Sequence, residues 1–265
     1  MKTMTDLSQG RYLLLLDILG FSELVLTKGR EEVLGTINEA LNAFSRWESL
    51  NQQFKTIYFS DTFLFYQVPK GYGNWAFLDV YAIGSFILTA LLAKGIPARG
   101  AITFGDFDVV DGAQGNHQVY FGTALVNAHR AERRENWIGI TIEPSAWHPY
   151  ASENPLNIGA FEDEKVWLKR DDEVLLLNPF VKMRVWHRDD SIGEITVPYL
   201  EWDQPEFPNE IRAFAFLEKT AESYSKSNDF TGRVATKYHA TSAFVRQIFG
   251  PELYEWACKI SKESM

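Results

Sequence analysis

Two aspartates stand where apolar runs end, an unfavourable place for an isolated negative charge. Asp17 follows the run Tyr12–Leu16, and Asp61 lies inside the segment Tyr58-Phe-Ser-Asp-Thr-Phe-Leu-Phe65. Taking an unpaired carboxylate out of water costs several kcal/mol even after the protein relaxes. A divalent metal ion shared by both carboxylates would offset this cost. The pair therefore predicts metal-dependent chemistry, whereas either aspartate taken alone would be typical of the cap of a turn.

The composition is that of an ordinary globular protein. A chain of 265 residues with 46% hydrophobic and 23% charged residues allows one large domain, or a core domain with an elaboration. The formal charge of −9 argues against a surface that binds nucleic acid. An anionic substrate would need local cations, which bound metal ions can supply.

Cysteine content and apolar runs bear on the compartment. The single cysteine, Cys258, excludes an intrachain disulfide and a cysteine-based zinc site, and it fits a reducing cytoplasm. No apolar run reaches the roughly 18–20 residues of a membrane span, and Tyr12–Val25, the longest candidate, is broken by Asp17 and Gly20. The N-terminus does not read as a signal peptide. We therefore expect a cytoplasmic protein that binds no membrane.

The hydrophobic pattern predicts the elements that must position the two aspartates. Residues 11–18 form a buried strand, and two short strands fold around Ser60-Asp61-Thr62. The remaining elements of this half are helices at 30–50, 75–94 and 122–135 and strands at 56–59, 63–67, 99–107 and 137–142. The order β-α-β-β-α-β, with a further α-β unit, predicts an α+β, ferredoxin-like core with helices on one face of the sheet.

The pattern loosens beyond about residue 150. Short strands are predicted at 166–168, 174–177 and 181–185, and helices near 209–227 and 231–249. We therefore divide the chain into a core at 1–150 and, at 151–265, extra strands and two helices packed on that core.

Four segments together resemble the class III nucleotide cyclases. Asp17-Ile-Leu-Gly-Phe-Ser22 resembles the Asp-Ile-x-Gly-Phe-Thr/Ser signature of that family, and Asp61 matches its second metal-binding aspartate. Arg99-Gly-Ala-Ile-Thr-Phe-Gly105 resembles its Arg-x-Gly-Ile-x-x-Gly strand. Gly122-Thr-Ala-Leu-Val-Asn-Ala-His-Arg130 resembles its Gly-x-x-Val-Asn-x-Ala-x-Arg helix start. The motifs occur in the family's order.

The resemblance implies a reaction from nucleoside triphosphate to 3′,5′-cyclic nucleotide and pyrophosphate. It implies that Asp17, Asp61 and the carbonyl of Ile18 bind two Mg²⁺ or Mn²⁺ ions. Arg130 would stabilise charge that builds on the α-phosphoryl group. The backbone groups expected to face the metal and the phosphates, as a helix N-terminus would, are the amides of Gly20, Phe21 and Ser22.

The chain departs from the family pattern at two motifs. Val126 stands at the position of the family asparagine, and Asn127 follows it, so Asn127 shares a helix face with Arg130 and is the candidate for that role. Purine cyclases usually carry Lys-x-x-Gly-Asp before the second aspartate. Here Ser60 replaces the glycine, and Tyr58 stands on the approach to Asp61. Tyr58 could instead simply pack on the sheet.

These departures and the extra C-terminal helices resemble the bacterial pyrimidine cyclases of Pycsar anti-phage defence. An aromatic ring in place of the lysine would suit a smaller base, with UTP preferred over CTP. The resemblance further implies a head-to-tail homodimer with two composite sites, and a product that acts on a separate cyclic-nucleotide-binding effector. The alternatives are a purine cyclase, or a catalytically silent cyclase-homology module.

Overall fold

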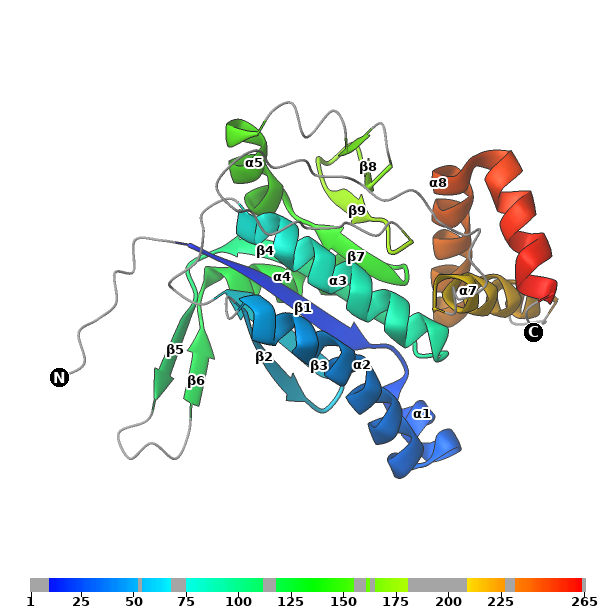
Figure 1. Ribbon diagram of the computed structural model, residues 1–265, viewed down its shortest axis with the longest axis horizontal. Coiled ribbons are helices and arrows are strands. Elements are labelled where there is room, and N and C mark those ends of the chain that lie inside the picture. Colours follow the sequence, from blue (N-terminus) through cyan, green and yellow to red (C-terminus); the bar gives the residue numbers. More distant parts are fainter. Residues whose placement is uncertain are drawn as a thin grey trace.

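A mixed sheet of seven strands forms the centre of the protein, seen here in a computed structural model (Figure 1). The structure describes residues 10–51, 54–67, 75–111, 118–154, 161–162, 165–180, 209–226 and 232–263. The strand order is β2-β3-β1-β4-β7-β9-β8, and of these pairs only β4 with β7 is parallel. The strands are β1 (Arg11–Ile18), β2 (Phe54–Phe59), β3 (Thr62–Gln67), β4 (Ala98–Gly105), β7 (Gly139–Ile142), β8 (Trp167–Lys169) and β9 (Leu175–Leu177).

Strand β1 is covered by helices on both faces. Leu14 and Leu16 belong to the larger core, which also contains α2 (Arg30–Asn51) and α3 (Trp75–Ala93). Leu13 and Leu15 point to the opposite face, where Ala124 and Ala128 of α4 (Thr123–Arg134) cover them. The prediction of helices on one face is therefore wrong, because a strand that is apolar on both sides must be covered on both sides.

Helix α3 is the core helix of the fold. Ala76–Ala93 is long and apolar enough to cross a membrane, with a mean hydropathy of 1.9, but 78% of this stretch is buried inside the protein. The expectation that no run reaches such a length is therefore wrong, although a buried core helix meets the same criterion. The helix ends at Ala93, one residue before the predicted end, and the following turn is closed by hydrogen bonds from the Gly95 amide to the Leu92 carbonyl and from the Ile96 amide to the Leu91 carbonyl.

The α+β class and the β-α-β-β-α-β order are confirmed, with additions that the hydrophobic pattern missed. These are a second, two-stranded sheet and two short helices: β5 (Asp108–Asp111), β6 (Gln118–Phe121), α1 (Phe21–Lys28) and α5 (Pro144–Glu153). All four are short, and α1 buries no residue, so periodicity gives little signal there. The strand predicted at 181–185 lies outside the described residues.

The C-terminal part packs on the same sheet and helices. Strands β9 and β8 continue the sheet beyond β7, and α7 (Asn209–Lys226) packs on α3. Helix α8 (Arg233–Glu263) packs on α7 and consists of two helical parts separated by a kink at Gly250 with φ 69°, so its first part ends at the predicted residue 249 and the second part was not predicted. A division of the chain at residue 150 stays a prediction.

One buried threonine ties α8 to the sheet. Thr241 Oγ1 accepts a hydrogen bond of 2.8 Å from the Ile138 amide and lies 3.3 Å from the Ile138 carbonyl. Ile138 directly precedes β7, so this contact fixes the first half of α8 at one end of that strand.

Replacing Thr241 by valine should lower the free energy of unfolding by about 1–3 kcal/mol, because the buried Ile138 amide would lose its partner. Denaturant unfolding measures the change. Thr236→Val is the matched control, since the exposed Thr236 hydroxyl donates its hydrogen bond to the carbonyl of Gly232, which directly precedes the same helix. Equal effects of the two substitutions would contradict a docking role for Thr241.

Candidate active site

A row of polar side chains crosses three strands at one end of the sheet. Asp17 on β1 lies opposite Thr62 on β3 and opposite Arg99 on β4. Asp17 has the same parity along β1 as Leu13 and Leu15, so the row faces the α4 side. Thr62 Oγ1 donates a hydrogen bond of 3.2 Å to Asp17 Oδ1.

The β2–β3 turn brings Asp61 to the same end of the sheet. Phe59 pairs with Thr62, so Ser60 and Asp61 form the turn, and the Ile18 amide donates a 2.8 Å hydrogen bond to the Asp61 carbonyl. Ser60 has φ 58°, a left-handed conformation that glycine adopts most easily. The left-handed backbone of this turn is a physical reason why the purine-cyclase motif has glycine where this chain has Ser60.

The two carboxylates repel each other. Burial is the largest cause that raises the pKa of Asp17, to about 6, and the negative charges of Asp61 and Glu132 contribute to this rise, while Thr62 and Arg99 act in the opposite direction. A bound cation would relieve this repulsion, so the residues present fit a divalent metal ion. Among the described residues, no three His, Cys, Asp or Glu side chains form a metal-holding group. The two aspartates would therefore need further ligands from the backbone or from a substrate.

Arg99 is engaged by the end of α4. Its Nε donates a 2.7 Å hydrogen bond to Glu132 Oε1, Nη2 also binds Glu132, and Nη1 donates to the Glu135 carbonyl at 2.6 Å. Glu132 is 4% exposed, so the pair is largely removed from water. The guanidinium of Arg99 therefore holds α4 against the sheet beside Asp17.

Helix α1 begins directly after the Asp17 strand. Gly20, with φ 68°, precedes the first helical residue Phe21, and no side chain caps this end. The Leu19 amide bonds the Pro97 carbonyl at 2.8 Å, which fixes the connecting backbone. The uncapped amides of Phe21 and Ser22 thus lie at a helix N-terminus, where anions bind favourably.

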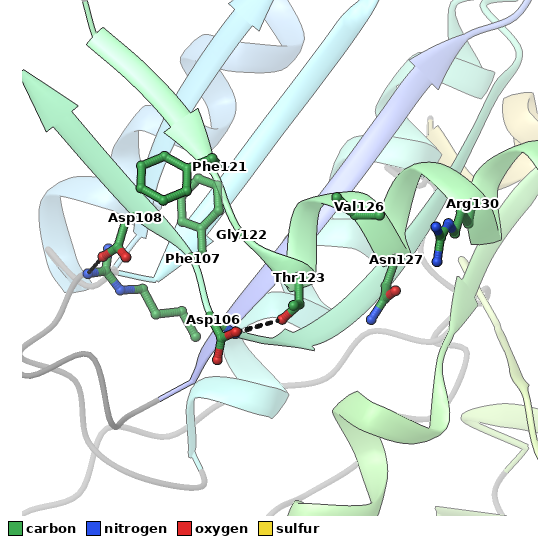
Figure 2. Close-up of a pocket in the computed structure, with 10 residues that line it drawn as sticks. Asp106, Phe107, Asp108, Phe121, Gly122, Thr123, Val126, Asn127 and Arg130 are labelled. Atoms are coloured by element: carbon green, nitrogen blue, oxygen red, sulfur yellow. Dashed lines mark hydrogen bonds and ion pairs between the residues drawn. The ribbon is translucent and has the colours of Figure 1, made fainter.

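Asn127 and Arg130 lie in a different place, a pocket of about 680 Å³ beside the start of β1. Figure 2 shows both side chains on one side of α4, with Thr123 bonded to Asp106 at the start of the helix. Neither Asp17 nor Asp61 lines this pocket. The lining residues are Arg11, Asp106, Phe107, Asp108, Phe121, Gly122, Thr123, Val126, Asn127 and Arg130. Arg11 lies about 20 Å along β1 from Asp17, so one subunit does not gather the aspartates and this pocket into one cavity.

Successive side chains of β2 point to opposite faces of the sheet, so Tyr58 and Ile57 lie on different sides as the strand approaches Asp61. Tyr58 packs on Phe63, with ring centroids 4.6 Å apart, and contacts the core on the α2 and α3 side. Ile57 contacts the smaller core on the α4 side, and Phe59, of the same parity, is 78% exposed. The purine-cyclase motif has lysine four residues before its aspartate. Ile57 occupies that position before Asp61, and its side chain lies on the same side of the sheet as Asp17. A role for Tyr58 in substrate binding stays a prediction.

Sequence reasoning missed several residues of these two regions. Thr62 and Glu132 contact or face Asp17, and Arg11 and Asp108 form an ion pair of 3.6 Å at the pocket. The predicted hairpin could have identified Thr62. Thr62 directly follows the two-residue turn of Ser60 and Asp61, so it is the first residue of the strand that pairs with β1. Glu132 gave no comparable signal, since charged residues on a helix are usually solvated.

In metal-free protein, Asp17→Asn should raise the free energy of unfolding above pH 6. The pKa of Asp17 is raised to about 6 in the folded state, so the charged carboxylate destabilises the fold at higher pH. We expect a gain on the order of 1–2 kcal/mol at pH 7.5 that disappears by pH 4, after discounting for partial exposure. Denaturant unfolding in EDTA at both pH values measures it. A gain that persists at pH 4 would contradict this origin.

Comparison with known proteins identifies the fold that holds these residues. No protein-family model and no curated protein matches the sequence. The dimeric guanylyl cyclase domain of the RhoGC fusion protein from the fungus Blastocladiella emersonii is similar, with a TM-score of 0.50 and 14% identity over 64% of this chain and 93% of that chain. The adenylyl cyclase CyaB from P. aeruginosa has a TM-score of 0.47 and 16% identity over 70% of this chain and 97% of that chain. The chain thus has the α+β fold of the class III nucleotide cyclases.

Proposed function

We propose that the protein is a nucleotide cyclase that converts a nucleoside triphosphate into its 3′,5′-cyclic nucleotide and pyrophosphate. One observation carries the proposal: Asp17 and Asp61 meet at the end of the sheet, close enough that the charge of Asp61 raises the pKa of Asp17. A module without catalytic function would have little physical reason to keep two repelling carboxylates there. The cyclase fold supports the same conclusion.

In this proposal Asp17, Asp61 and the Ile18 carbonyl hold two Mg²⁺ or Mn²⁺ ions. When bound, the ions would lower the pKa of the ribose 3′-hydroxyl and neutralise the triphosphate. The amides of Gly20, Phe21 and Ser22, at the uncapped start of α1, bind phosphate oxygens. Thr62 keeps Asp17 oriented through its 3.2 Å hydrogen bond.

A second copy of the chain completes the site. Arg130 and Asn127 are exposed and line a pocket that excludes both aspartates, so the Arg130 of one subunit would serve the Asp17 and Asp61 of the other. Exposed apolar side chains accompany both regions: Phe59 beside Asp61, and Val126 and Phe121 at the pocket. Burial of these side chains between two subunits would favour such a dimer.

The base is proposed to be a pyrimidine, with UTP preferred over CTP. Ile57 faces the Asp17 side where a purine cyclase would present a lysine, so the hydrogen bond that lysine offers is missing. In this proposal Ser60 approaches the base from the turn before Asp61, whereas Tyr58 packs on the opposite face of β2 and would act through its contact with Phe63. A cytoplasmic role in anti-phage defence, through a separate effector, follows the resemblance to the Pycsar enzymes. A purine cyclase is the second candidate, because the similar solved structures are adenylyl and guanylyl cyclases.

Purified protein with Mn²⁺ should convert UTP, and CTP more slowly, to cyclic nucleotide and pyrophosphate, with ATP and GTP poorer substrates. Chromatography of products from the four triphosphates measures this. Asp61→Ala should abolish turnover without unfolding the protein, because its backbone carbonyl still binds Ile18. The exposed carboxylate of Asp171 provides the control variant Asp171→Ala, which should be active.

The outcomes of this panel separate the candidates. Product from ATP or GTP alone would overturn the pyrimidine assignment, and no product from any triphosphate would overturn the enzyme assignment. Ile57→Lys should shift turnover toward a purine triphosphate by about tenfold, because it restores a charged hydrogen-bond donor.

Mixed subunits test the composite site. Asp17→Ala and Arg130→Ala proteins should each be inactive, but their mixture should regain about one quarter of wild-type activity, because half of the dimers are then mixed and each has one intact site. The matched control mixes Asp17→Ala with Asp61→Ala, which places both defects on the metal side and should stay inactive. Failure of the first mixture despite verified subunit exchange would refute the shared site.

A further inference from the structure

Helix α8, outside the predicted core, reaches the end of the sheet that holds Asp17. Thr241 of this helix is bonded to Ile138, which directly precedes Gly139 at the start of β7. Gly139 lies opposite Arg99, and Arg99 lies opposite Asp17. Adjacent strands are about 5 Å apart, so two strand spacings separate this docking point from Asp17.

Lys237 lies one helical turn before Thr241 on the same side of α8. The Thr241 hydroxyl donates a 2.9 Å hydrogen bond to the Lys237 carbonyl, so the two residues stack along one helix face. Thr241 faces the sheet, and Lys237 therefore faces the sheet end as well. Its side chain is partly buried, which distinguishes it from an ordinary solvated lysine.

The charges that surround Lys237 are those of the candidate active site. Burial lowers the pKa of its ammonium, Arg99 lowers it further, and the carboxylates of Glu132 and Asp17 act in the opposite direction. Arg233, one turn earlier on α8, is a further cation nearby. These electrostatic neighbours agree with the placement that the β-strand register and the Thr241 contact give.

Among the described residues of this cluster, Lys237 is the partly buried cation without a partner of its own, whereas Arg233 is exposed. The guanidinium of Arg99 is already bound by Glu132 and the Glu135 carbonyl. Within the described part of the chain, Lys237 forms neither an ion pair nor a hydrogen bond through its ammonium group. Partial burial of an unpaired ammonium is unfavourable, so the group is poised to bind an anion.

We propose that α8 supplies Lys237 to the active site, where its ammonium binds the terminal phosphates of the triphosphate that become the pyrophosphate leaving group. This inference rests on the proposed nucleotide-cyclase function and assigns a role to a helix beyond residue 150. A protein with a formal charge of −9 needs such a local cation to bind a polyanion. The opposing possibility is that Lys237 only offsets the charges of Glu132 and Asp17.

Calorimetric titration of the full chain with inorganic tripolyphosphate in Mn²⁺ tests the proposal without requiring turnover. Lys237→Met should weaken tripolyphosphate binding at least tenfold, as expected for loss of a charge-assisted hydrogen bond, and Lys237→Arg should retain most of the affinity. Lys259→Met, which removes an exposed lysine from the same helix, is the matched control and should bind like wild type. Thermal unfolding of each variant verifies that it is folded.

The outcomes distinguish this inference from the proposed function. If Lys237→Met binds tripolyphosphate as wild type does, or if wild type does not bind it, the role of Lys237 is wrong even when the protein is an active cyclase. If Lys237-dependent binding is found but no triphosphate is turned over, the phosphate site stands and the cyclase proposal fails. If Lys237→Met is unfolded, Lys237→Gln takes its place under the same criteria. In an active enzyme, Lys237→Met should also raise the KM for the nucleotide.

Discussion

Repulsion between Asp17 and Asp61 is the interaction on which the surrounding structure depends. Asp17 lies near the end of a strand that is covered on both faces, so its carboxylate is partly buried. Thr62, Arg99 and the backbone bond from Ile18 to Asp61 hold the two acids in place rather than letting them separate. The fold therefore maintains an unfavourable concentration of negative charge, which makes the site receptive to cations.

A network of ion pairs and hydrogen bonds connects the surroundings of Asp17 to residues beyond 150. Glu135, whose carbonyl binds Arg99, uses its carboxylate to bind Arg170 in two contacts of 2.8 and 3.0 Å. Arg170 in turn holds Asp172, and this contact lowers the pKa of Asp172 to about 2. The end of α4 is thus fixed both to the central sheet and to the turn between β8 and β9. Residues beyond 150 help to position the core site through this network.

The same C-terminal part reaches the site from a second direction through α8. Thr241 docks this helix at the start of β7, and Lys237 then faces the acids that β1 and α4 present. The helix is also held on α7 by Glu218, which accepts a hydrogen bond of 2.7 Å from Ser242. An element that adds no strand to the sheet can therefore still influence the electrostatics at the end of the sheet that holds Asp17 and Asp61.

The sequence by itself determined the α+β class, the order of the main elements and the two aspartates, because local hydrophobic periodicity and motif spacing are properties of short segments. It did not reveal the second helical layer over β1, or that Tyr58 packs away from Asp17 while Ile57 faces it. Those facts depend on strand register, and a shift of one residue reverses every side chain. Only the tertiary structure placed Glu132 and Lys237 beside Asp17, because both come from helices whose surface charges have no local pattern that distinguishes a buried site from solvent.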